Sequence, residues 1–588
     1  MPHDIHSFAR PDEAIVKHLS LDLNIDFDKK IISGKAVLEI ENKAGTGTLY
    51  LDSRDLNIQK ITLDDNAETA FTKGESVKYL GQELKIKIKP STKKVSVEYS
   101  TSPDAAALQW LSPEQTAGGK FPFLFTQSQA ILARTWIPLQ DSPGIKFTYD
   151  AVIHCPENLM AVMSADNDSV KHADGIYRFH MPQPIPSYLM ALAVGDLSFH
   201  SYNNICGVFA EPSMIEKCAY EFEDMPKMIS SAEELYGKYQ WGRYDVLVLP
   251  PSFPFGGMEN PRITFATPTI IAGDRSLVAL VAHELAHSWS GNLVTNATWN
   301  DFWLNEGFTV YFETRIMEKI YGRDYADMLS LLSLNELKNT VKELGEKNPD
   351  TKLFLDLKDR DPDDGVTDIA YQKGRFFLTA IEQNVGREKW DAFLKKYFSE
   401  FAFQIMTTEK FIDYLKKEFP GQLSDEFINS WIYGTGLPAD CPEIISTELT
   451  KAGRAAVYIQ KGMSVKSFET ANWTTHHWLY FIRSIGDTLS GEKMKMLDDA
   501  FHFTQSGNCE IQCDWYQLSI KNKYAAAYPY LEKFLMTVGR RKFLKPLYTG
   551  LAKTADGKEM AKRIYAKARA GYHAVSYQTI DEILGTNN

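Results

Sequence analysis

The sequence predicts a multidomain α+β protein with a β-sheet domain first, a mixed domain in the middle and an all-helical domain last. A chain of 588 residues is too long to fold around one core. Apolar and polar residues alternate with period two in the first third, whereas helical patterning dominates after residue 197. The predicted bounds are 1–196 for the β-sheet domain, 197–438 for the mixed domain, 439–451 for a proline-containing linker and 452–588 for the helical domain.

Half-buried strands are predicted along the first domain. Apolar residues occupy every second position from Leu19 to Phe27, which is typical of an antiparallel strand with one face in the core. The same alternation returns at 84–88 and 95–99. Gln127 and Gln129 lie two residues apart on a predicted strand and therefore face the same way. Their amides could bind a polar group of a substrate, but the local sequence alone favours two surface glutamines.

A glycine pair follows a hydrophobic strand that is predicted at 245–249. After a proline-rich turn, the chain reads Phe255-Gly256-Gly257-Met258-Glu259-Asn260. Adjacent glycines allow a backbone to approach a ligand closely, and an extended segment here could bind a peptide as an added strand. Glu259 would then face the bound peptide. The local sequence alone favours the alternative, which is a Gly-Gly turn before a surface strand.

A metal site is predicted where two helices meet. The first helix, at 276–293, contains His283-Glu284-Leu285-Ala286-His287, and the second, at 305–321, carries Glu306 near its start. Residues four apart share a helix face, so the two histidines can bind one Zn²⁺ with Glu306 as third ligand. Three protein ligands leave a fourth position for water, and Glu284 is placed to take its proton. The alternative is two ordinary helix histidines beside a surface carboxylate.

The rest of the chain is predicted to be mostly helical, for example at 371–385 and 388–401, with an interruption at the Pro/Gly-rich stretch 433–442. The pair His476-His477 has no carboxylate or cysteine at metal spacing, so we expect ordinary helix positions. Cys509 and Cys513 could share a helix face as metal ligands. No second pair supports such a site, which favours buried free thiols.

Charge and composition restrict the partners. A net charge of -12 without a basic face argues against nucleic acid or an anionic membrane surface. No apolar stretch has the length of a membrane helix, so no membrane insertion is expected. The first residues lack the basic and apolar run of a signal peptide, and the six cysteines are scattered, which together predict a cytoplasmic protein. We expect a monomer or a weak homo-oligomer.

Several motifs together resemble the gluzincin metalloaminopeptidases of the aminopeptidase N type. Glu306 follows His287 with eighteen residues between, and the Gly256–Asn260 segment precedes both. The closer match is to the branch of leukotriene hydrolase and its bacterial cold-active aminopeptidase-like relatives. That match covers nearly the whole chain and rests on Thr126-Gln127-Ser128-Gln129-Ala130, Trp303-Leu304-Asn305-Glu306-Gly307, Ala370-Tyr371-Gln372-Lys373-Gly374 and Gly539-Arg540-Arg541-Lys542-Phe543.

The resemblance implies a β-saddle N-terminal domain, a thermolysin-like zinc domain and a superhelical, armadillo/HEAT-like C-terminal domain. It also implies an aminopeptidase with one Zn²⁺ per chain, acting on short peptides with a free N-terminus. The implied ligands are His283, His287 and Glu306, and Glu284 is the implied general base. Further implied site residues are Tyr371 for the oxyanion, Glu259 and Gln129 for the α-amine, Gln127, Gly256, Gly257 and Met258 along the substrate, Arg540 and Lys542 for a carboxylate, and Glu313 for orienting a ligand.

The same resemblance raises fatty-acid epoxide hydrolysis as a second activity. Asp363 lies eight residues before Tyr371, as the epoxide-opening aspartate does in the leukotriene enzyme. Vertebrate members have a further tyrosine five residues before the catalytic one, and this chain has Val366 there. An endopeptidase would leave Glu259 and Gln129 unpaired, which argues against that activity. A non-catalytic binding protein is the remaining alternative, but each position of the metal ligands and of the general base holds a residue that can perform that role.

Overall fold

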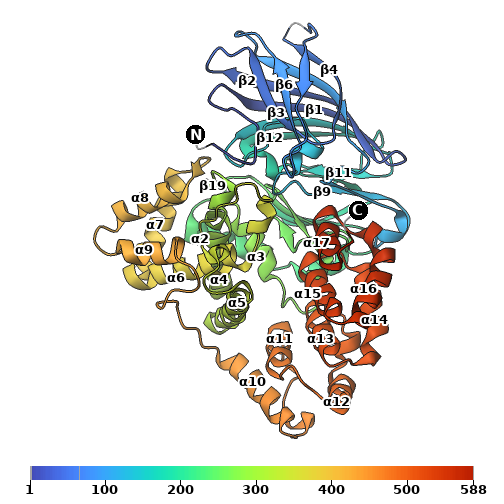
Figure 1. Cartoon of the computed structure of the whole chain (residues 1–588), viewed down its shortest axis with the longest axis vertical. Helices are drawn as coiled ribbons and strands as arrows, with labels where there is room; N and C mark the ends of the chain where they lie inside the picture. Colours follow the sequence, from blue (N-terminus) through green and yellow to red (C-terminus); the bar gives the residue numbers. More distant parts are fainter. Residues whose placement is uncertain (1–2, 65, 587–588) are drawn as a thin grey trace.

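The structure is a computed structural model that describes residues 3–64 and 66–586. The chain forms three parts around a common centre (Figure 1): β-sheets at the N-terminal end, a mixed α/β part in the middle and stacked helices at the C-terminal end. This order confirms the predicted architecture. None of the helices in the described ranges combines the length and apolar character needed to cross a bilayer.

The N-terminal part contains three sheets. In the six-stranded sheet, β1 pairs antiparallel with β2 and parallel with β10, and its predicted inward side chains Leu19, Leu21 and Leu23 are buried. The six-stranded sheet has the order β12 (Ile176–Pro186), β10 (Lys146–His154), β1 (Ala14–Asp26), β2 (Ile31–Asn42), β7 (Lys94–Ser100) and β4 (Asn57–Leu63). The three-stranded sheet has the order β3 (Thr48–Ser53), β6 (Gln82–Lys87) and β5 (Phe71–Lys73). The four-stranded sheet has the order β11 (Met160–Met163), β13 (Leu192–Gly195), β9 (Phe123–Thr126) and β8 (Leu108–Leu111).

The middle part contains a five-stranded sheet and most of the buried helices. The sheet has the order β14 (Ser198–Asn203), β15 (Cys206–Ala210), β16 (Tyr244–Val248), β18 (Ile263–Ala266) and β17 (Gly257–Met258). The helices are α1 (Ile215–Glu221), α2 (Met225–Tyr236), α3 (Ala279–Ala286), α4 (Trp303–Tyr321), α5 (Arg323–Leu344), α6 (Gly374–Val385), α7 (Arg387–Glu400), α8 (Thr408–Glu418) and α9 (Asp425–Ile432), and the short strands β19 (Thr295–Asn296) and β20 (Ile405–Met406) pair with each other. β17 therefore lies at the edge of its sheet.

The C-terminal part has its own core, which includes Trp515, Tyr516 and Tyr548. Helices α11, α13, α15 and α17 form a row in which each contacts the next, and α14 and α16 lie outside it (Figure 1). The row faces the middle part. The helices are α10 (Thr447–Gln460), α11 (Thr475–Ser484), α12 (Gly491–Phe501), α13 (Cys509–Lys521), α14 (Tyr528–Thr537), α15 (Arg541–Ala552), α16 (Ala555–Ala568) and α17 (Ala574–Leu584).

Two predicted bounds differ from the structure. The helix predicted at 276–293 is shorter, since the chain leaves α3 at His287 and turns at Gly291, whose φ is 103°. The linker predicted to reach residue 451 ends at Ser446, where α10 begins. The Ser446 side chain caps this helix by accepting a hydrogen bond from the backbone N–H of Leu449, and Leu449 packs against Met328 of α5.

Candidate active site

Three predicted ligands meet between α3 and α4. Nε2 of His283 lies 3.4 Å from Oε2 of Glu306, and Nε2 of His287 lies 3.6 Å from the same oxygen. The ligand atoms of the three residues all lie within 4.8 Å of one another. The helix spacing predicted for the two histidines therefore gives one cluster with the glutamate from the next helix.

The donor set fits a divalent cation. Oε2 of Glu306 is buried between the two imidazoles and has no hydrogen-bond partner in the described part of the chain. A buried carboxylate oxygen without a partner is costly unless a cation binds it. Two nitrogens and one oxygen from three residues match a catalytic Zn²⁺ site, in which a fourth position stays open. Glu259 and Glu284 lie close to His287 as well, so three carboxylates gather here.

Hydrogen bonds orient both imidazoles. Nδ1 of His283 lies 3.1 Å from Oε2 of Glu313, as the predicted orienting role requires. Nδ1 of His287 lies 3.0 Å from the carbonyl oxygen of Ser290 and 3.0 Å from Oδ1 of Asn305. Such contacts hold the Nε2 atoms towards a metal. The role of Asn305 was missed in the sequence analysis, although it stands directly before Glu306 in the quoted motif.

Glu284 lies next to the glycine pair. A Cβ atom at Gly257 would stand 2.2 Å from Oε1 of Glu284, and one at Gly256 would stand 2.7 Å from Nη2 of Arg540. Burial, with Glu259 and Glu306 adding to it and His283 opposing it, raises the pKa of Glu284 well above its usual value. Gly257 begins the two-residue edge strand β17, and Gly256 lies in the bend that leads into it; the strand is at the edge of its sheet but Met258 is buried, so it is not a surface strand. The free edge of β17 can bind an extended peptide.

We expect Gly257→Ala to lower kcat/KM on an aminoacyl-anilide by about 100-fold, since the new methyl group displaces the Glu284 carboxylate by roughly 1 Å or more. The thermal midpoint should change little. Gly491→Ala is the control, because a Cβ atom at Gly491 meets open space. An unchanged kcat/KM in Gly257→Ala would contradict the close approach of Glu284 to the strand.

Two glutamines after β9 and the glutamate after β17 are buried. The exposed fraction of the residue is 1% for Gln127, 8% for Gln129 and 4% for Glu259. The surface position favoured for the glutamines is therefore wrong; both follow β9 instead of lying in it, because that strand ends at Thr126. Nε2 of Gln127 donates to Sδ of Met258 at 3.2 Å, and Oε1 of Gln127 has no partner among the described residues.

Glu259 is held in place from both ends. Its carbonyl oxygen accepts a hydrogen bond from Nδ2 of Asn292 at 2.8 Å, and Oε1 accepts one from Nδ2 of Asn305 at 3.4 Å. Burial raises the pKa of Glu259, and Glu306 raises it further while His287 opposes the shift. A buried carboxylate with one weak partner is suited to an incoming cation.

Tyr371 reaches the site through a single π-helical turn, Ile369–Lys373, which precedes α6. Its ring lies 6.1 Å from that of His283, nearly parallel at 13°. A Cβ atom at Gly307 would stand 2.8 Å from Cα of Gly374, so the glycines of two motifs let α4 and α6 approach backbone to backbone. Burial and the nearby carboxylates raise the pKa of Tyr371 well above its usual value, which keeps the phenol protonated as a hydrogen-bond donor.

Arg540 and Lys542 share a carboxylate that the sequence analysis missed. Nη1 of Arg540 donates to Oε1 of Glu510 at 3.2 Å, and Nζ of Lys542 lies 2.9 and 2.8 Å from the two oxygens of Glu510. Burial alone would raise the pKa of Glu510, but the two cations hold it at about 2. Arg540, Lys542 and Glu510 together carry one net positive charge. Backbone N–H groups of Gly539 and Arg541 donate to Pro251 and Pro254 and so fix this segment beside β17.

Asp363 lies beside the glutamine segment. Burial together with the charge of Asp361 raises the pKa of Asp363 to about 7, and the backbone of Ala130 is close enough to oppose this shift. The described residues that could hold the metal do not include it. Val366, where a tyrosine would stand in vertebrate relatives, lines the neighbouring cavity.

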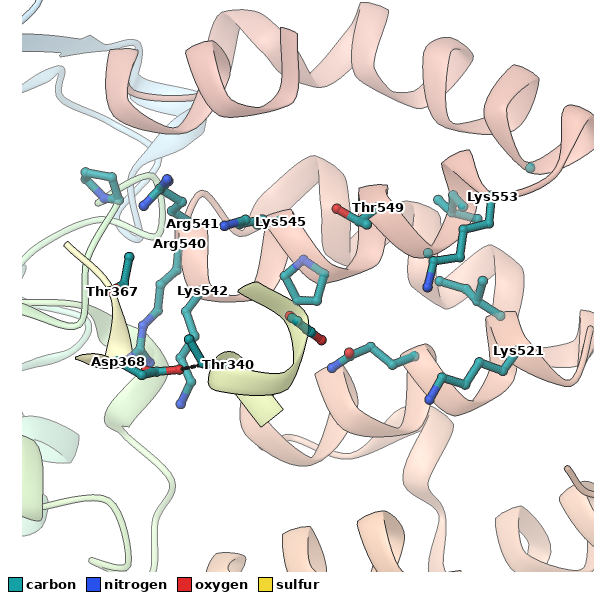
Figure 2. Close-up of a pocket in the computed structure, with 18 of the residues that line it drawn as sticks. Thr340, Thr367, Asp368, Lys521, Arg540, Arg541, Lys542, Lys545, Thr549 and Lys553 are labelled. Atoms are coloured by element: carbon teal, nitrogen blue, oxygen red, sulfur yellow. Dashed lines mark hydrogen bonds between the residues drawn. The ribbon is translucent and has the colours of Figure 1, made fainter. Parts of the chain in front are cut away.

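A cavity of about 1250 Å³ joins the site to the C-terminal helices (Figure 2). Gly256, Tyr371, Arg540 and Lys542 line it at the end near the zinc ligands. Four predicted site residues from three distant stretches of the sequence therefore face one space. The remaining walls come from α5, α13, α15 and the start of α16.

Two imidazoles and a carboxylate with a further glutamate beside them are typical of zinc-dependent hydrolases. Comparisons with known proteins narrow this class. The model of the peptidase family M1 domain matches residues 220–431, that of the peptidase M1 N-terminal domain matches 15–189, and that of the leukotriene A4 hydrolase C-terminal domain matches 473–584. The chain belongs to the M1 family of peptidases, which are hydrolases.

Relatives match over nearly the full length. Leukotriene A-4 hydrolase of Xenopus laevis is 36% identical over 97% of this chain and 98% of its own. Leucine aminopeptidase 2 of Chaetomium globosum is 35% identical over 99% of this chain and 98% of its own. The structure of yeast LTA4 hydrolase in complex with bestatin superposes with a TM-score of 0.92 at 31% identity, covering 99% of this chain and 97% of that one. These matches confirm the predicted family and the three-part architecture.

Proposed function

We propose that this protein is an aminopeptidase that binds one Zn²⁺ per chain and removes N-terminal residues from short peptides. The observation that supports it best is the position of Glu259, a buried and weakly paired carboxylate beside the ligand cluster at the end of an edge strand. Held by His283, His287 and Glu306, Zn²⁺ would act as a Lewis acid on the scissile carbonyl and acidify a water. Side chains of the protein carry out the proton transfers and bind the oxyanion and the α-ammonium group.

Glu284 is the proposed proton carrier. It accepts the proton of the attacking water and passes it to the leaving amine, a transfer that a carboxylate with a raised pKa performs near neutral pH. The phenol of Tyr371 donates a hydrogen bond to the developing oxyanion. Glu259 and the amides of Gln127 and Gln129 hold the α-ammonium group, so only the first peptide bond reaches the reacting groups.

Zinc dependence and amine dependence test the proposal together. We expect hydrolysis of leucine p-nitroanilide to fall at least about 100-fold on dialysis against a chelator and to return with Zn²⁺. N-acetyl-leucine p-nitroanilide should remain uncleaved throughout. Cleavage of the acetylated substrate at a similar rate would argue for an endopeptidase, and activity that survives loss of the metal would exclude the zinc mechanism.

We also propose epoxide hydrolysis as a second activity, favoured by Asp363 and by the relative named leukotriene A-4 hydrolase. Asp363 lies beside the backbone of Ala130, next to the glutamine that is proposed to bind the substrate. Its carboxylate could bind the water that opens a fatty-acid epoxide. Chromatography of products from the leukotriene epoxide, with wild type and Asp363→Asn compared, tests this. Equal diol formation by both would rule out the role of Asp363.

Membership of the family does not show the substrates, the oligomeric state or the cellular location of this protein, so these are proposals. Short peptides with a free N-terminus are the proposed substrates, and the monomeric or weakly associated state stays a prediction. A cytoplasmic location is supported by six free thiols, which are typical of reducing compartments.

A further inference from the structure

The cavity beyond the zinc-proximal end is lined by cations on one face of α15. Arg541, Lys545 and Lys553 lie four and eight residues apart, with Thr549 between the two lysines, and all four line the cavity. Positions four apart on a helix lie on one side. Figure 2 shows the four side chains in sequence along the cavity, from the Arg540 end towards Lys553. The result is a cationic stripe, defined as Arg541, Lys545 and Lys553.

The stripe has no carboxylate partner among the described residues. Nε of Arg541 donates to Oγ1 of Thr579 at 2.8 Å, and neither lysine makes an ion pair with a described residue. By contrast, Lys542 and Arg540 share Glu510, and Lys521 at the far end pairs with Asp487 at 2.6 Å. Burial and the charge of Arg541 lower the pKa of Lys545, while the charges of Glu343, Asp368 and Glu582 oppose this shift. Lys545 and Lys553 are exposed to solvent along the cavity wall, and Arg541 is half-buried.

Helix stability does not explain the stripe. Arg541 is the first residue of α15 and Lys545 follows one turn later, where the helix dipole disfavours positive charge. Like charges four apart on a helix also destabilise it. Only Lys553, at the C-terminal end, is placed favourably. An anionic ligand in the cavity would offset these costs.

The acidic lining of the cavity forms no ion pair with the stripe within the described residues, although the charges of Glu343 and Asp368 act on Lys545. Glu343 and Asp368 lie on the wall towards α5, and Asp556 lies on α16 at the far end. Asp368 accepts a hydrogen bond from Oγ1 of Thr340 at 2.6 Å, and none of the three carboxylates forms an ion pair with the stripe. The cations therefore remain available to a ligand.

The spacing of the stripe matches an extended peptide. Four residues of helix rise about 6 Å, and side chains on one side of an extended strand repeat every ~6.6 Å. A peptide whose amine is held at Glu259 runs along β17 past Arg540 and then reaches α15. Acidic side chains at alternate positions would therefore meet Arg541 and Lys545, whereas Lys553 lies eight residues, about 12 Å of helix rise, beyond Lys545.

We propose that the cationic stripe is a subsite for acidic residues in the C-terminal half of the substrate, beyond its third residue. The inference rests on the proposed aminopeptidase function and adds a substrate class: peptides of about six residues with Asp or Glu at alternate positions. Arg540 and Lys542 hold the terminal carboxylate of shorter substrates, whereas the stripe acts on longer ones.

Three hexapeptides test the subsite: Leu-Ala-Ala-Glu-Ala-Glu and its counterparts with Gln or Lys at the fourth and sixth positions. We expect kcat/KM for the Glu peptide to exceed that for the Lys peptide by about tenfold, since each exposed ion pair adds a modest factor. The preference should shrink at about 0.5 M salt. In the double variant Arg541→Glu and Lys545→Glu, which reverses the two cations whose spacing the peptide matches, the order should reverse, while hydrolysis of leucine p-nitroanilide, which is too short to reach the stripe, stays unchanged.

Lys562→Glu is the matched control, because Lys562 is an exposed lysine of α16 outside the cavity. It should retain the wild-type preference. Equal kcat/KM for the three peptides, or a preference that the double variant retains, would overturn the subsite. Fluorescence anisotropy of labelled peptides, measured with the Glu284→Gln variant, compares the affinities of the three peptides without hydrolysis. If the anilide is not hydrolysed, the proposed function fails; if it is hydrolysed and the peptides behave alike, only the subsite fails.

Discussion

Glu284→Gln should retain zinc and the fold but lose hydrolysis of leucine p-nitroanilide by roughly 10²- to 10⁴-fold in kcat. The amide has the size of the carboxylate and cannot accept the proton of the attacking water. Oε1 of Glu284 faces Gly257 at the edge strand, so the variant side chain occupies the same space. KM should change little, because substrate binding depends on other groups.

The measurements are metal content by mass spectrometry, thermal unfolding and steady-state kinetics on the same preparation. Glu409→Gln, an exposed carboxylate in the first turn of α8, is the control for losing one negative charge. A Glu284→Gln variant that keeps its zinc and still turns over near the wild-type rate would remove the general base from the mechanism. Loss of zinc together with activity would instead assign Glu284 to the metal site.

Glu259→Ala should lower kcat/KM on leucine p-nitroanilide more than 100-fold, because the substrate ammonium loses its buried partner. This factor corresponds to about 3 kcal/mol of lost transition-state stabilisation. Asn305 and Asn292 hold Glu259 in the wild type, so the anchor is rigid. The variant should also lose its discrimination between the free and the N-acetylated substrate.

Rates on the two anilides, measured side by side, distinguish an anchor from a structural role. Glu259→Gln keeps the shape and one hydrogen bond, and we expect its loss to be smaller than that of the alanine variant. An alanine variant as fast as wild type would show that the amine is held elsewhere, for example by Gln127 and Gln129 alone. Equal thermal midpoints among the three proteins confirm that any loss is local.

The zinc cluster could be predicted from local sequence because the chemistry depends on spacing. His283 and His287 share a face of any helix, and the structure places Glu306 beside them from the next helix. The period-two alternation of β1 likewise predicted which of its side chains are buried. In both cases the period of the backbone alone decides which side chains point the same way.

Other parts of the site depend on contacts between distant segments. Gln127 and Gln129 have the local features of surface residues, yet both are buried because the N-terminal sheets pack against the middle part. Glu510 pairs with Arg540 and Lys542 across two helices of the C-terminal core. No local pattern contains such contacts, and only the resemblance to relatives pointed to the glutamines.

The sequence by itself determined the order of the three parts, the three residues that form the candidate metal cluster and the family, since these follow from periodicity, helix spacing and motif. Only the tertiary structure decided that Gly257 lies in an edge strand pressed against Glu284, that two glycines bring Tyr371 to His283, and that the cations along α15 and at its C-terminal end line the cavity. The physical reason is that burial and charge pairing depend on which surfaces meet. Residues far apart in the chain acquire their neighbours only when the domains pack.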